Sequence, residues 1–288
     1  MGVPKIRAVL TSLALVGAAT LTTAATAGPA QSAAASAPPV AVSITNTRVV
    51  TMPTTIQPGV NTFTVTTANK RGSSFQLVQA AAGYSAADAA RDIEKGLDGG
   101  NVKAIKRFEA NITLLGGVSV TKDRAGKAVV DLPAGDYWAL DVNTNDPDKF
   151  FAFTVAGLDT GNVVPVADAT LKAVQDTTWA NKPASIPNKG WMTFKNAASQ
   201  NHFIVMAKLK KGMTYRDFKQ WFADGAESAP PINFGIGMDS AVVSPGHSAS
   251  FKYNLPKGNY VMLCFWPDAS MGGMPHAFMG MHRPITLK

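Results

Sequence analysis

The sequence contains few cysteines, which form disulfides in exported proteins, and few histidines, which bind the ions of multinuclear metal centres. Its 288 residues include one cysteine, Cys264, and four histidines, at positions 202, 247, 276 and 282. One cysteine cannot form an internal disulfide, so an unpaired thiol needs another explanation. Beyond the N-terminal region, no apolar stretch reaches the roughly 18–20 uncharged residues of a spanning helix, which predicts a protein without membrane insertion.

The N-terminus has the pattern of a secretory signal peptide. Lys5 and Arg7 precede an apolar run at residues 13–19, and the small residues 25–27 provide a cleavage site after Ala27. We therefore expect residues 1–27 to be removed and the protein to be secreted, away from nucleic acid. Residues 28–39 lack large apolar side chains and read as a disordered spacer.

The rest of the chain repeats itself. Five segments recur in the same order: residues 59–63 match 190–194, 75–78 match 203–206, 83–96 match 212–225, 132–137 match 255–260, and 153–155 match 285–287. This pattern predicts a tandem duplication, with domains at 40–158 and 166–288 and a linker at 159–165.

Each copy reads as short strands interrupted by one helix. Clusters of Thr, Val and Phe alternate with Gly, Pro and Asn turns. Ser85 with Asp88, and Thr214 with Asp217, have the spacing of a capping box at a helix start. The expected fold class is all-β with one inserted helix per domain, as two β-sandwiches.

Residues with metal-binding side chains gather near the C-terminus. Cys264 ends an apolar strand, His276 follows twelve residues later, and Met281 five residues after that. A thiolate, an imidazole and a weak thioether suit copper cycling between Cu(I) and Cu(II). A second imidazole can come from His202, at the start of an apolar strand that we expect to neighbour the Cys264 strand.

These residues resemble the cupredoxins, the blue copper proteins. Gly258-x-Tyr260-x-x-x-Cys264 is similar to their last-but-one strand, and His276-x-x-x-Gly280-Met281 is similar to their ligand loop. The resemblance implies two tandem cupredoxin-like β-sandwiches. It also implies one type 1 copper per chain, with His202, Cys264, His276 and Met281 as ligands. Eleven residues separate Cys264 from His276, a longer loop than in plastocyanin or azurin.

The first copy serves as an internal control. Alignment puts Asp141 at the position of Cys264 and Ser74 at the position of His202, and no histidine precedes His202. The first copy also lacks nine residues of the ligand loop. We therefore expect it to keep the fold without binding metal.

Three functions remain open, and none is enzymatic. Four histidines are too few for a multicopper oxidase, and the apolar neighbours of Cys264 offer no activation for hydrolysis. The first reading is single-electron transfer. The second is copper delivery, favoured by Met271, Met274, Met279 and Met281 around His276. The third is an exported structural or interaction module with a vestigial site.

Charge is concentrated in the second copy. Residues 166–288 hold 13 basic and 7 acidic side chains, a net charge of +6, and Lys208, Lys210 and Lys211 are the densest cluster. Such a run ordinarily forms a solvated surface, and the alternative is that it attracts an acidic redox or copper-exchange partner. For electron exchange we expect the ring edge of His276 to approach the surface beside residues 277–279.

Overall fold

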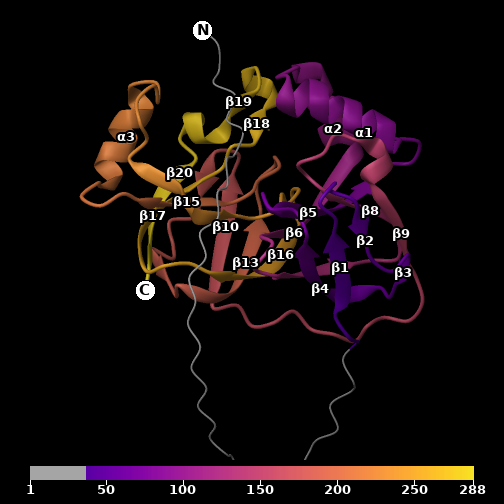
Figure 1. Cartoon of the computed structure of the whole chain (residues 1–288). Helices are drawn as coiled ribbons and strands as arrows, with labels where there is room; N and C mark the ends of the chain where they lie inside the picture. The colour runs from indigo at the N-terminus through magenta and orange to yellow at the C-terminus, as the bar shows by residue number, and fades with distance from the viewer. Residues whose placement is uncertain (1–36) are drawn as a thin grey trace, which may run out of the picture.

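The computed structural model describes residues 37–288, and within them the chain forms two β-sandwiches side by side (Figure 1). The predicted signal peptide lies outside the described residues, as does most of the predicted spacer. No helix in the range 37–288 is both long and apolar enough to cross a bilayer.

The first half of the chain supplies two facing sheets. Phe63 and Phe75, on strands of opposite sheets, meet in the core with ring centroids 5.7 Å apart. The strands are β1 (Val40–Ile44), β2 (Val50–Thr51), β3 (Thr55–Ile56), β4 (Gly59–Thr67), β5 (Ser73–Ala80), β6 (Ile112–Val120), β7 (Gly126–Leu132), β8 (Gly135–Asp141) and β9 (Phe151–Val155).

The second half repeats this arrangement and adds one small hairpin. Its strands are β10 (Ala169–Gln175), β11 (Thr178–Trp179), β12 (Ser185–Ile186), β13 (Lys189–Asn196), β14 (Val205–Leu209), β15 (Ile232–Asp239), β16 (Ser248–Asn254), β17 (Gly258–Leu263), β18 (Pro267–Asp268), β19 (Met274–Pro275) and β20 (His282–Leu287). Sheet order β3-β9-β8-β5-β6 in the first half corresponds to β12-β20-β17-β14-β15 in the second. The expected fold class of paired β-sandwiches is confirmed.

One sheet runs through both domains. Its order is β11-β10-β13-β16-β7-β4-β1-β2, and β16 pairs with β7 antiparallel at the domain boundary. Ala128 pairs with Phe251 there, and each lies four residues before a matched leucine of the repeat, Leu132 or Leu255. Equivalent positions therefore pair with each other, so the two domains are related by a local two-fold axis.

The tyrosines of the matched segments make the same contact in both copies. The Tyr137 hydroxyl donates to the carbonyl of Pro133, and the Tyr260 hydroxyl donates to that of Pro256, both at 2.7 Å. Each bond fixes the turn that enters β8 or β17. The duplication seen in the sequence thus extends to side-chain hydrogen bonds.

The helices differ between the copies. The second domain has one α-helix, α3 (Tyr215–Ala223), and the short 3₁₀ turns η3 (Ala269–Met271) and η4 (His276–Met279). The first has α1 (Ala86–Asp92), the π-helix η1 (Ile93–Asp98), a further helix α2 (Val102–Asn111) and the 3₁₀ turn η2 (Pro147–Lys149). Both expected capping boxes are present.

Helix α2 was not expected from the sequence. The Asn101 side chain caps it by accepting the amide of Ala104, and Ile105 and Phe108 are buried with Ala104 on its inner face. The buried residues of α2 therefore have helical spacing, but the helix is only ten residues long and buries only these three side chains, a short pattern in the sequence.

Candidate metal centre

The four residues of the predicted centre converge at one end of a sheet. Cys264 directly follows β17, and His202 precedes β14, which pairs with β17. His276 opens η4, and Met281 directly precedes β20, the other neighbour of β17. All four side chains are fully buried.

Three ligand atoms meet in a compact triangle. The Cys264 Sγ lies 3.5 Å from Nδ1 of His202 and 3.7 Å from Nδ1 of His276. The two Nδ1 atoms lie 3.1 Å apart. The Nδ1 atoms and the sulfur thus face one another, as the donors of a single metal ion must.

Met281 is fixed beside this triangle by its backbone. Its amide donates to the carbonyl of His276 at 2.9 Å, and its carbonyl accepts the amide of Cys264 at 3.3 Å. The indole of Trp179 donates to the same carbonyl at 3.2 Å. Met281 therefore lies between two of the other predicted ligands, within the same buried cluster as Cys264.

A glutamine covers the ring of His276. The Nε2 of His276 lies 2.6 Å from the Gln200 carbonyl oxygen, which makes Nε2 the protonated nitrogen and leaves Nδ1 a free lone pair. Gln200 in turn donates to Asp268 at 3.1 Å. The expected approach of the His276 ring to the surface is wrong, because Gln200 occupies the space outside the ring.

Burial keeps all three ligand groups neutral in the absence of metal. Desolvation lowers the pKa of His202 to about 3, with a smaller contribution from His276, and lowers the pKa of His276 to about 4. Desolvation raises the pKa of Cys264 to about 12, although amides of Phe203 and Trp266 donate to its sulfur. A bound cation reverses this balance for the thiol, because coordination favours the thiolate.

The donor set suits copper and does not suit magnesium or calcium. Two imidazoles and a sulfur, with a methionine fixed beside them, are ligands for a soft or borderline ion, and no carboxylate belongs to the cluster. The Nε2 of His202 is also buried without a hydrogen-bond partner among the described residues. Such a desolvated cluster costs stability, which metal coordination offsets.

The first domain fills the corresponding place with an ion pair. Asp141 is fully buried, accepts the amide of Ser74 at 3.1 Å and pairs with Arg48 at 2.6 Å. The amide of Phe203 makes the equivalent contact with Cys264. Ser74 is therefore the counterpart of Phe203, and Ser73 takes the position of His202, one residue from the expected match.

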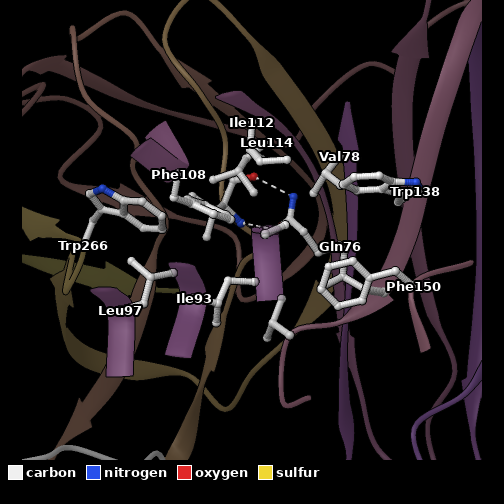
Figure 2. Close-up of a pocket in the computed structure, with 14 residues that line it drawn as sticks. Gln76, Val78, Ile93, Leu97, Phe108, Ile112, Leu114, Trp138, Phe150 and Trp266 are labelled. Atoms are coloured by element: carbon white, nitrogen blue, oxygen red, sulfur yellow. Dashed lines mark hydrogen bonds between the residues drawn. The ribbon is translucent and has the colours of Figure 1, made fainter. Parts of the chain in front are cut away.

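Two cavities lie near the domain boundary, outside the triangle. A polar cavity of about 240 Å³ is lined by Gln200, Glu109 and His247, among others. An apolar cavity of about 100 Å³ lies between the first-domain helices and β5, with Phe108 and Trp266 in its wall (Figure 2). Neither cavity contains a predicted ligand.

The sequence did not predict a role for Gln200 or Trp266 beside the centre. Neither belongs to a motif, and the one signal that could have found them is their position, two residues from His202 and from Cys264.

Strand order and ligand placement together decide the fold. A sandwich with ligands after β17, before β14 and before β20 is the arrangement that the resemblance to blue copper proteins implied. The fold is cupredoxin-like. In the first cupredoxin-like domain the same sheet order is present, with Asp141 in place of the cysteine.

Comparisons with known proteins give only distant matches. No protein-family model and no curated protein matches the chain. Reduced auracyanin from Roseiflexus castenholzii is 23% identical, covering 42% of this chain and 95% of its own, with a TM-score of 0.27. Auracyanin B is 18% identical, and the match covers 44% of this chain and 93% of auracyanin B, with a TM-score of 0.27. Copper nitrite reductase from Nitrosomonas europaea is 12% identical, and the match covers 86% of this chain and 93% of the reductase chain, with a TM-score of 0.22. Likenesses this distant leave the buried triangle of Cys264, His202 and His276 as the guide to function.

Proposed function

We propose that the second domain holds one type 1 copper ion and that the protein is a secreted single-electron carrier. The observation that carries this proposal is the buried triangle of Cys264, His202 and His276. Copper bound there would supply the Cu(I)/Cu(II) couple. Nδ1 of each histidine and the Cys264 sulfur would hold the ion, with Met281 as the fourth, weaker ligand.

Rigid placement of the ligands favours electron transfer. Cys264 and Met281 share a backbone hydrogen bond, and so do Met281 and His276. Because these bonds do not depend on the metal, the ligands stay near one geometry in both oxidation states. A small change in geometry on electron transfer lowers the cost of reorganisation.

The route to a partner passes the apolar residues beside His276. Phe278 and Met279 are half-buried, and Phe278 stacks on Phe222 of α3 with ring centroids 4.8 Å apart. Lys208 and Lys210 on the same domain complement an acidic redox partner. We propose the surface of Phe278 and Met279, rather than the ring edge of His276, as the contact for electron exchange.

Copper delivery is the second candidate, because two methionines of the ligand loop are exposed. The exposed fraction is 53% for Met271 and 43% for Met274. Surface thioethers bind Cu(I) and can pass it on by ligand exchange. A protein of this kind would need no redox partner.

Replacing the three loop methionines by leucine separates the two functions. Leucine preserves volume and apolarity while removing the sulfurs of Met271, Met274 and Met279. For an electron carrier we expect unchanged Cu(II) colour and unchanged Cu(I) retention against a chelator, as in the control Met213→Leu. Rapid loss of Cu(I) from the triple variant alone would favour delivery, and failure of the parent chain to bind copper would leave the structural-module reading.

A further inference from the structure

The first domain carries a helix that the second lacks, and this helix lies against the ligand loop. In the second domain a loop leads from α3 to β15, whereas in the first domain α2 precedes β6. Helix α2 contacts η3, inside the segment between Cys264 and His276. In Figure 1 the first-domain helices lie next to β18 and β19.

Two adjacent residues of α2 hold one tryptophan of the second domain. The Glu109 carboxylate accepts the indole N–H of Trp266 at 2.7 Å. The ring of Phe108 lies 6.4 Å from that of Trp266, and Figure 2 shows both side chains at the same end of the apolar cavity. Trp266 is 4% exposed. Its side chain is therefore fixed largely by the other domain.

The backbone of Trp266 touches two predicted copper ligands. Its amide donates to the Cys264 sulfur. Its carbonyl accepts the amide of His276 at 2.9 Å. A displacement of Trp266 would thus move a hydrogen bond to the sulfur and the anchor of one imidazole together.

The third ligand is also held from the first domain. His202 and Val243 exchange backbone hydrogen bonds of 3.2 and 2.8 Å, and Val243 forms a β-bridge with Leu115 of β6. The neighbouring Ser244 exchanges two further bonds, each 2.8 Å, with the backbone of Leu114. The backbone that supports His202 is therefore continuous with a first-domain strand.

We propose that the ligand-free domain functions as a positioning domain for the copper centre, with Glu109 as a positioning residue for Cys264 and His276 through Trp266. This inference rests on the proposed function. The ligand loop contains Gly272 and Gly273, both at positive φ, and within the second domain Gln200 holds it through Asp268. Helix α2 adds a restraint from the other side through η3 and Trp266, which gives a reason for the first domain to keep its fold without ligands.

The test compares Glu109→Ala with Glu109→Gln in the full chain. Glutamine keeps the carbonyl oxygen that accepts the indole N–H, whereas alanine removes it. Loss of a hydrogen bond to a charged group predicts roughly tenfold faster copper release to a chelator for Glu109→Ala, with a shifted charge-transfer band. In Glu109→Gln the rate of copper release and the position of the charge-transfer band should both be close to those of the wild type. Glu94→Ala, at an exposed position of η1, is the matched control and should behave as wild type.

A measurement on the copper-free chain separates this inference from the proposed function. Amide hydrogen exchange at His276 should accelerate roughly tenfold in Glu109→Ala, because the Trp266 carbonyl that accepts it is no longer fixed. Trp266→Phe keeps an aromatic side chain but removes the indole N–H, and it should also accelerate exchange at His276 if Glu109→Ala does not fold. Exchange and copper release equal to those of Glu94→Ala would overturn the inference. A wild-type chain that binds no copper, with accelerated exchange in Glu109→Ala, would instead reject only the proposed function.

Discussion

Acid should destabilise the copper-free protein through its two buried imidazoles. Burial holds the pKa of His202 at about 3 and that of His276 at about 4, against an ordinary value of 6.5. In the unfolded chain both side chains take up a proton as the pH falls through 6.5, whereas in the folded chain they stay neutral down to about pH 4. Their contribution to stability is therefore complete above pH 6.5 and declines below it.

The size of the loss follows from the width of this interval. Each pH unit below 6.5 costs about 1.4 kcal/mol per histidine. Between pH 7.5 and pH 5.0 the loss is about 2 kcal/mol for each of His202 and His276, and about 4 kcal/mol for the pair. This is a large part of the stability of an ordinary domain, about 5–15 kcal/mol.

The assay is urea unfolding of the copper-free chain at pH 7.5 and at pH 5.0. Other groups titrate in this range, so the wild type is compared with His202→Gln/His276→Gln. The double variant should lose about 4 kcal/mol less than the wild type on acidification, and each single variant about 2 kcal/mol less. Equal losses in all four proteins would refute the argument that these imidazoles are buried and neutral.

Three further substitutions test the rest of the fold. Arg48→Met leaves the fully buried carboxylate of Asp141 without its charged partner and should lower the free energy of unfolding by about 3 kcal/mol, measured by denaturant titration; a loss below about 1 kcal/mol would show that this pair is solvated. Tyr137→Phe and Tyr260→Phe each remove one hydrogen bond to a backbone carbonyl, and each should cost about 1 kcal/mol. Clearly unequal costs would contradict the equivalence of the two domains.

The duplication and the four predicted ligands could be recognised in the sequence because both are carried by residue identities at matching positions. Cys264, His276 and Met281 lie within one short segment, and the strand before Cys264 fixes its direction. The pairing of β14 with β17 then brings His202 to the same place. These four positions could be predicted without any knowledge of how the domains meet.

The alignment of the copies failed by one residue for a physical reason. Phe75 and Phe203 match as letters, but Phe75 is fully buried, whereas Phe203 is half-buried. The buried counterpart of Phe75 is Ile204, at 0% exposure. Burial, and not residue identity, sets the register of these strands, so Ser73 rather than Ser74 corresponds to His202.

What depends on the domain boundary could not be predicted. The pairing of β7 with β16 and the contact between Glu109 and Trp266 join segments more than a hundred residues apart. Gln200 covers His276, and it can do so only because the loop that carries His276 folds back next to the segment that carries Gln200. The residues that make these contacts belong to no recognisable sequence motif.

Optical titration of the full chain with Cu(II) is the most direct test of the central claim. The three facing donors predict an intense visible band from thiolate-to-copper charge transfer, complete at one copper per chain and absent in Cys264→Ser. The first domain, with Asp141 paired to Arg48, should add no second site. A colourless copper adduct of the parent chain, or a band that persists in Cys264→Ser, would contradict the type 1 assignment.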